Sequence, residues 1–317
     1  FAAFDPVSFA ISMLVSTVLS KLLAPSPPSL NQQAEPNPGS RAQTPPAGDN
    51  KLPVIYGHSW TGGMITDLSI TTDNQTLYYV FALSEVTNTE GQDGSTPDTI
   101  TFGDVYWGGK KCIFDKDPRE ANKLVKDVQY RITTVGTTNW IAIGAGSTTI
   151  GTVFTKNATA GTGTGFAEPV DQSNVTGLYD PSTSQTQDIT GYMNVYLYKN
   201  GSNNPANSLT GAISLMQATD LTYKWDSGKL MTNCAFAIIK LKYSQSRNLT
   251  ALNATNFELT NSRVAPGDCF LDYLGSTRYG AAIPVENIDT ASLTALNIYS
   301  NAPIGYTTYT GGSSTQS

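Results

Sequence analysis

The sequence predicts a mainly β protein, and three observations support this fold class. From Ile239 to Tyr243 apolar residues alternate with lysines, as in a strand with one buried face and one wet face. Short apolar runs recur between turn signals such as Gly108-Gly109, which favours a two-residue hairpin. Charged residues make up only 14% of the chain, below the ~25% usual for soluble domains.

The net charge of −6 limits the kinds of partner. No run rich in Lys and Arg occurs, so the sequence argues against tight binding to nucleic-acid phosphates. A mildly acidic surface is compatible with DNA that passes through a channel without being held.

The N-terminal region is predicted to be a helix, residues 1–24, on a proline-rich tether, residues 25–50. Asp5 suits a helix cap, Pro6 suits the first helical position, and Pro25 ends the helix. Three interpretations of this helix remain open: a marginal membrane span, a signal peptide without the usual basic start, or a helix that packs on another protein. The last is favoured, because a tethered helix usually docks onto something other than its own domain.

The folded body is predicted to begin at residue 51, and residues 51–127 form its first part. Its expected strands are 52–57, 64–72, 77–86, 99–106 and 111–114. The polar span from Asn88 to Asp98 is expected to be an exposed loop. Residues 115–127 hold the densest charge, of mixed sign, which indicates a solvated surface with one helical turn.

Residues 128–168 are predicted to be an inserted small β module. Its expected strands are 128–132, 138–143 and 151–154. Gly161 to Gly165 follow them as flexible turns. The second part of the body, residues 169–265, is expected to contain a strand at 192–199, a turn at 200–201, a return through 211–217 and a strand within 230–243.

Residues 266–300 are predicted to be a two-helix segment, and residues 301–317 a flexible end or the start of a further domain. Pro266 and Asp268 suit the first turn of the first helix. That helix is expected to place three apolar side chains on one side: Phe270, Leu271 and Leu274. Asp289 or Thr290 caps the second helix. The second helix is expected to bury Leu293, Leu296 and Ile298.

Residue types that carry chemistry are few. Cys112, Cys234 and Cys269 are widely spaced and are expected to be free thiols, buried in apolar surroundings. The single histidine, His58, cannot build a metal cluster or a triad with them. The glycine-rich spans 144–151 and 161–165 lack the Gly-Lys-Ser/Thr and the following helix of a phosphate loop.

Two sets of carboxylates remain. Asp268 and Asp272 lie one helical turn apart, but helix capping and a solvated face explain them better than a shared metal. A glycosidase pair would have to come from four residues that nothing in the sequence places in one cleft: Asp104, Asp115, Asp117 and Glu120. No catalytic, cofactor-binding or metal-binding residue is therefore predicted, and the chain is not expected to be an enzyme.

Several short segments occur in a recognisable order. The later ones are Lys240-Leu241-Lys242-Tyr243, Leu271-Asp272-Tyr273-Leu274, Arg278-Tyr279-Gly280, Ile288-Asp289 and Ala291-Ser292-Leu293. The earlier ones are Leu52-Pro53-Val54-Ile55-Tyr56-Gly57, Ala82-Leu83-Ser84-Glu85-Val86 and Gly103-Asp104-Val105-Tyr106-Trp107. In this order, over roughly residues 51–300, the chain resembles the tail-tip hub proteins of tailed bacteriophages, the J-like host-specificity family. Residues 128–168 also resemble a small β module inserted in many phage structural proteins.

The resemblance implies a hub-type β-barrel or sandwich that forms a homotrimeric ring and closes the distal end of the tail tube in the virion. The partners it implies are further copies of the chain, the distal tail or tail tube protein, the tape measure protein, and tail fibre or tip proteins. DNA would only pass through the channel, and membrane contact of residues 1–24 is the less favoured alternative. A rival hypothesis is a cell-surface or virion adhesin that binds carbohydrate, and another is a carbohydrate-cleaving tail enzyme.

Overall fold

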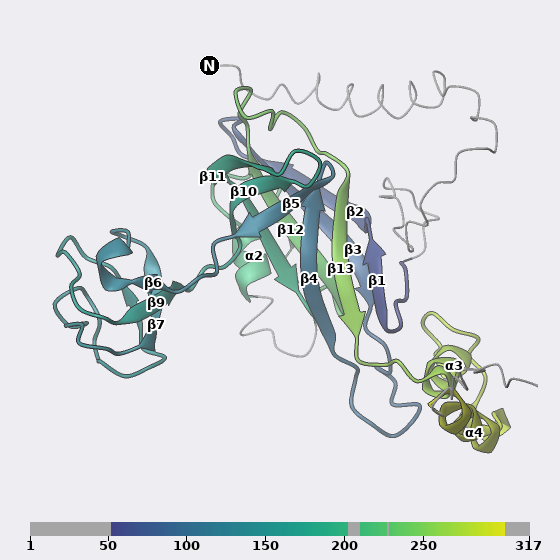
Figure 1. The fold of residues 1–317 in the computed structure, drawn as a ribbon. Coiled ribbons are helices and arrows are strands. Elements are labelled where there is room, and N and C mark those ends of the chain that lie inside the picture. The colour runs from purple at the N-terminus through teal and green to yellow at the C-terminus, as the bar shows by residue number, and fades with distance from the viewer. Residues whose placement is uncertain (1–51, 202–209, 227, 302–317) are drawn as a thin grey trace, which may run out of the picture.

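A computed structural model describes residues 52–201, 210–226 and 228–301 (Figure 1). The predicted N-terminal helix, its tether and residues 302–317 lie outside the described residues. The mainly β fold is confirmed, with a nine-stranded antiparallel sheet in the order β1-β13-β4-β5-β10-β11-β12-β3-β2. Its strands are β1 (His58–Thr61), β2 (Met64–Ile70), β3 (Thr76–Glu85), β4 (Ile100–Trp107), β5 (Lys110–Phe114), β10 (Asn174–Asp180), β11 (Gln185–Tyr198), β12 (Cys234–Lys242) and β13 (Thr255–Asn261).

The sheet curls into a half-barrel around one core. β3 and β13 each lie second from an edge of the sheet, yet the rings of Phe81 and Phe257 are 5.6 Å apart across the core. The two edge strands, β1 and β2, are joined by the buried pair Gly62-Gly63, so both sheet edges start at one corner. Gly63 has φ +67°, and a Cβ there would lie 2.7 Å from Leu83, so this corner requires glycine.

Side chains alternate between two faces of the sheet, as the strand period requires. Leu77, Tyr79 and Phe81 of β3 point into the curl and belong to the main core. The opposite side of the same strand, with Val80, is covered by helix α2 (Thr210–Met216) and the loop that carries Trp225. The helix covers only part of this outer face.

The inserted module is a second, four-stranded sheet that projects from the main sheet between β5 and β10 (Figure 1). Its elements are β6 (Arg119–Glu120), η1 (Ala121–Lys123), β7 (Gln129–Thr134), β8 (Val153–Thr155) and β9 (Phe166–Pro169). The module therefore begins before residue 128, the start predicted from the sequence. Its own small core surrounds the buried Trp140, whose ring nitrogen donates to the Val135 carbonyl at 2.8 Å.

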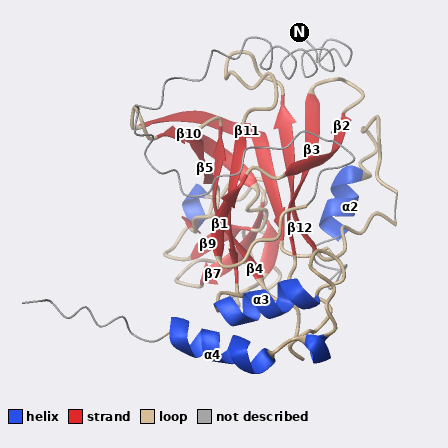
Figure 2. Cartoon of the chain, turned by 90° about the vertical axis from the view of Figure 1, so that its right-hand side faces the viewer, coloured by secondary structure: helices blue, strands red, loops and turns tan. Residues whose placement is uncertain are grey.

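Two helices, α3 (Pro266–Gly275) and α4 (Thr290–Ser300), lie side by side at one end of the sheet (Figure 2). A short 3₁₀ turn, η3 (Val285–Asn287), precedes α4. Asp289 caps α4 by accepting from the Ser292 amide at 3.1 Å, as predicted. The helices pack closely because Gly267 faces α4: a Cβ there would lie 2.0 Å from the Leu293 carbonyl oxygen.

Several predicted elements differ from the structure. The strand predicted at 52–57 is wrong, since only Val54 forms an isolated bridge and the strand begins at His58, after Gly57 with φ +61°. Residues 138–143 form turns rather than a strand, although Trp140 and Ile143 are buried. The return predicted through 211–217 is helix α2, and β13 lies in a segment for which no strand was predicted.

Burial of the C-terminal helices also differs from the prediction. Ile298, which was expected to be buried, is 70% exposed, and Phe270 is 54% exposed. Leu293 and Leu296 are only partly buried. The Gly161 to Gly165 span is closely packed instead of loose, because a Cβ at Gly161 would lie 2.0 Å from the Ala121 carbonyl oxygen.

Candidate interaction surface

The residues that the sequence offered for catalysis or metal binding lie apart from one another, and most of them form ion pairs. Three of the four carboxylates proposed for a glycosidase each pair with a base: Asp104 with Lys111, Asp115 with Arg119, and Glu120 with Lys123. His58 is exposed and lies 2.7 Å from Glu258. Within the described part of the chain, no group of three or more His, Cys, Asp or Glu side chains is placed to hold a metal ion.

The cysteines largely match the prediction of buried thiols. Cys112 and Cys234 are free and buried, and burial raises the pKa of each thiol to about 12. Cys269 is free and half-buried, and burial raises its pKa as well. A raised pKa leaves little reactive thiolate at neutral pH, so nothing in these environments activates a nucleophile.

Asp272 is the centre of a buried polar junction, and the solvated position predicted for it is wrong. Its side chain is completely buried and accepts from the Tyr56 hydroxyl at 2.6 Å, the Tyr279 hydroxyl at 2.7 Å and the Asn88 amide at 2.7 Å. Burial and the bond to Asp272 raise the pKa of both tyrosines, so both stay protonated donors. Beside them, Arg278 pairs with Glu85 at 2.7 Å.

This polar junction brings together three segments that are far apart in the sequence. Tyr56 precedes β1, Glu85 ends β3, Asp272 lies on α3, and Arg278 and Tyr279 follow α3. Little in the sequence indicates that they meet, because an i, i+4 aspartate pair is equally typical of a solvated helix face. A tyrosine before Gly57 and another after Arg278 were the only local signals.

A second network fixes the loop 88–98 to the same end of the sheet. The buried guanidinium of Arg263 pairs with Asp98 at 2.6 Å and with Asp93 at 2.8 Å. Burial acts to raise the pKa of Asp93, but Ser95, Arg263 and Asn88 together hold it well below its usual value. The loop is therefore anchored at its base, and only its middle, residues 93–96, together with Glu90, is exposed as predicted.

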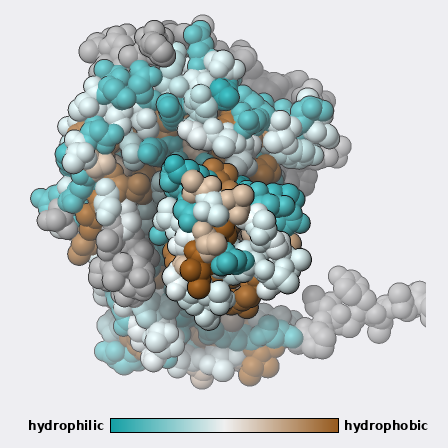
Figure 3. Space-filling model, turned by 90° about the vertical axis from the view of Figure 1, so that its left-hand side faces the viewer, coloured by the Kyte–Doolittle hydropathy of each residue, from teal (hydrophilic) through white to brown (hydrophobic). Residues whose placement is uncertain are grey.

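Large apolar side chains are exposed on and beside the anchored helices. We call α3, α4 and the residues that flank them the helical hairpin. Its exposed large apolar residues are Val264, Phe270, Tyr273, Val285, Ile298 and Tyr299. The inserted module also exposes apolar residues, including Ile141 and Ile150. Figure 3, in which that module faces the viewer, shows hydrophobic residues in brown at separate places on its surface.

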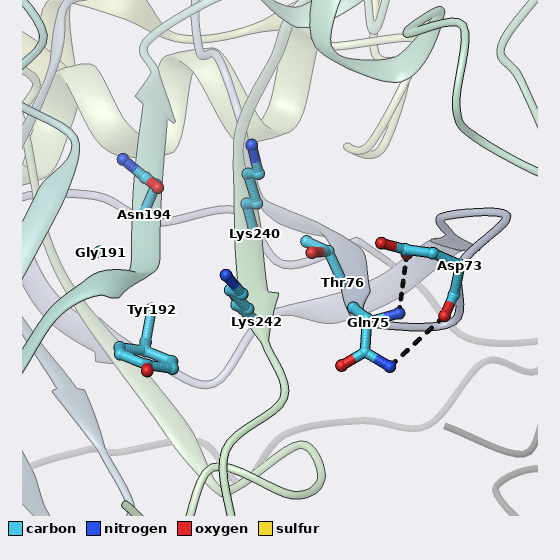
Figure 4. A pocket seen from close by; sticks show the side chains of 8 residues that line it. All are labelled: Asp73, Gln75, Thr76, Gly191, Tyr192, Asn194, Lys240 and Lys242. Carbon is cyan, nitrogen blue, oxygen red and sulfur yellow. Dashed lines mark hydrogen bonds between the residues drawn. The ribbon is translucent and has the colours of Figure 1, made fainter. Parts of the chain in front are cut away.

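The part of the outer sheet face that α2 leaves uncovered holds a hollow of about 710 Å³ (Figure 4). Lys240 and Lys242 project into it from β12, flanked by Tyr192 and Asn194 of β11 and by Thr76 of β3. Asp73 and Gln75 form the opposite rim. A second hollow shares Lys240 with this one, and a third shares Tyr196 and Tyr198 with the second. The three hollows therefore follow one another along β11.

We call this surface the lysine–tyrosine groove, defined by Tyr192, Asn194, Tyr196, Lys240 and Lys242. The strand alternation Tyr192-Met193-Asn194-Val195-Tyr196 was a usable signal, because residues two apart share a face. The sequence could not show that α2 stops short of these residues. Comparisons with known proteins add nothing here: no protein-family model matches the chain, and no curated protein matches it.

No helix in the described residues combines the length and the apolar character needed to span a bilayer.

Proposed function

We propose that this chain is a structural subunit, the hub of a phage tail tip, which assembles as a ring and closes the distal end of the tail tube. The resemblance of its short segments to that family suggests the role. The polar junction supports it most, because Tyr56, Glu85, Asp272 and Tyr279 come from the segments that carry the resemblance and meet at one place.

The polar junction has a mechanical consequence that suits such a role. It holds the helical hairpin to the end of the curled sheet while Phe270 and Ile298 stay exposed. Exposed apolar side chains on a rigid support are typical of surfaces that bind another protein. We take that protein to be the next copy in the ring.

The free edge of β1 supports assembly as well. Asn261 donates to the Gly57 carbonyl at 2.8 Å, so by strand alternation the backbone groups of His58 and Trp60 face away from β13. Among the described strands, none pairs with this edge. An unpaired edge invites pairing with another chain, and closure into a ring removes it.

Mass photometry and negative-stain imaging of the purified chain test the proposal. We expect a discrete ring, and we expect Phe270→Asp with Ile298→Asp to give monomers. The matched control is Ile141→Asp with Ile150→Asp on the inserted module, which should leave the ring intact. A wild-type chain that stays monomeric at micromolar concentration and binds no distal tail protein would falsify the proposal.

A further inference from the structure

The lysine–tyrosine groove carries two cationic side chains, Lys240 and Lys242. Across the described residues, neither Lys240 nor Lys242 forms an ion pair, whereas Lys110, Lys111 and Lys229 each do. The two residues are two apart on β12, so their side chains leave the strand about 7 Å apart. The chain as a whole is acidic, with a net charge of −6, which makes this local excess distinctive.

Tyrosine rings accompany the charges. The Lys240 ammonium lies 5.6 Å from the centre of the Tyr78 ring, and Lys242 lies 5.8 Å from the Tyr192 ring. The Arg247 guanidinium lies 4.3 Å from the Tyr192 ring. Farther along β11, Tyr196 lines both of the hollows that continue the groove. The groove therefore places the two lysines of β12 beside tyrosine rings of the neighbouring strands β11 and β3.

Acidic side chains interrupt the groove as well. Asp73 stands at the rim of the first hollow, Asp220 lines the second and Asp171 the third. A bond from the Thr71 hydroxyl, and another from the Gln75 amide at 3.0 Å, hold the pKa of Asp73 below its usual value, so it stays ionised. Carboxylates at these points would accept hydrogen bonds from the hydroxyl groups of a sugar.

An extended peptide fits the groove poorly. The first hollow is lined by polar side chains and one tyrosine ring, without an aliphatic pocket for an apolar anchor. The backbone beneath it is already paired, because β11, β12 and β3 are interior strands, so a peptide gains no ladder hydrogen bonds. Side-chain amides, carboxylates and rings are what remains for recognition.

We propose that the lysine–tyrosine groove binds an acidic oligosaccharide, a glycan in which carboxylates recur along the chain. Lys240 and Lys242 bind the carboxylates, Tyr192 and Tyr196 contact the faces of the sugar rings, and Asp73 and Asn194 bind hydroxyl groups. This inference does not depend on the hub role. A chain that stays monomeric and binds glycan would refute only the hub proposal. A chain that forms a ring and binds no glycan would refute only the glycan proposal.

Isothermal titration calorimetry of the full chain tests it, with three acidic probes and one neutral probe. The acidic probes are hexamers of mannuronate, galacturonate and glucuronate, and the neutral probe is β-1,4-mannohexaose. We expect at least one acidic hexamer to bind at least tenfold more tightly than mannohexaose, with an affinity that falls as salt rises. Failure of all three acidic hexamers to bind overturns the proposal.

Variants assign the binding to the groove. Lys240→Gln and Lys242→Gln should each weaken binding about tenfold, because each removes one charge-assisted contact. Tyr192→Leu should also weaken binding, although both lysine charges remain. Lys126→Gln, on the inserted module, is the matched control and should bind like the wild type. Thermal unfolding of every variant checks that the fold is kept.

Two further probes separate the rival occupants. Tighter binding of a thymidine decanucleotide than of any acidic hexamer would show a nucleic-acid groove and overturn the proposal. Tighter binding of hexaglutamate would show an acidic-peptide groove, and so would overturn it too. Acidic hexamers that bind Lys240→Gln, Lys242→Gln and the wild type equally well would place the site elsewhere.

Discussion

The rings of Phe81 and Phe257 lie 5.6 Å apart, although their strands stand second from opposite edges of the sheet. Both side chains are completely buried, so this contact closes the curl from within. Without it the strand ladders would remain, but the core would lose one of the contacts that hold the two ends of the sheet together.

Phe257→Ala should therefore lower the free energy of unfolding by about 3–5 kcal/mol, the cost of a large cavity in a core. Urea denaturation measures it. Phe270→Ala is the control, because Phe270 is 54% exposed and its truncation should change stability little. Equal effects of the two substitutions would contradict a core closed by Phe257.

Asp272→Asn should destabilise the attachment of the helical hairpin. An amide offers one acceptor oxygen where the carboxylate accepts from Tyr56, Tyr279 and Asn88, so at least one donor loses its partner. The expected loss is about 2–3 kcal/mol of unfolding free energy.

A double-mutant cycle with Tyr279→Phe checks whether the two groups act together, and coupling of about 1 kcal/mol is expected. Tyr299→Phe, on an 82% exposed residue, should show no coupling. Strict additivity of Asp272→Asn and Tyr279→Phe would argue against the polar junction.

The Asp93–Arg263 pair predicts sensitivity to acid. The folded-state pKa of Asp93 lies below its unfolded value of 3.8, so its contribution is present above about pH 4 and is lost as pH falls through the folded pKa. Asp93→Asn should cost about 1–3 kcal/mol at pH 6, and much less at pH 2.5.

Urea midpoints at the two pH values measure this difference. Asp117→Asn, a substitution in the charged stretch before β6, is the control and should have the same urea midpoint as the wild type at both pH values. A gap between Asp93→Asn and the wild type that stays constant down to pH 2.5 would contradict the pKa assignment.

Gly267→Ala should loosen α4 from α3. A Cβ at this position would lie 2.0 Å from the Leu293 carbonyl oxygen, so the helices must separate, at a cost of about 1–3 kcal/mol. Hydrogen exchange should show faster exchange of amides in residues 290–300. Gly146→Ala, where nothing lies within 4 Å of the new Cβ, is the control. Unchanged exchange in Gly267→Ala would mean that α3 and α4 accommodate the added methyl group without separating, contrary to the prediction.

If β1 pairs with another copy, proline at its outward-facing positions should prevent it. His58→Pro with Trp60→Pro removes two outward amides, and an edge strand tolerates proline there. The matched control, His58→Ala with Trp60→Ala, loses the same side chains and keeps the amides. Imaging should show rings for the alanine variant only. Rings from the proline variant would exclude β1 as the contact.

The local features of this protein were predictable because their causes are local. Gly108 and Gly109 both have positive φ, as a two-residue hairpin turn demands, and the alternation in Ile239 to Tyr243 matches β12. Asp289 caps α4 from its own side chain. The failures share a different cause. Residues 211–217 could be a strand or a helix by their own pattern, and packing on the outer face selects the helix.

The sequence by itself determined the strand alternation, the tight turns and the helix ends, because each depends on residues a few positions apart. Only the tertiary structure decided that Asp272 is buried among tyrosines, that Phe270 is exposed and that Lys240 and Lys242 stand in an open groove. Burial depends on which distant segments pack over a residue, and no pattern within one segment contains that information.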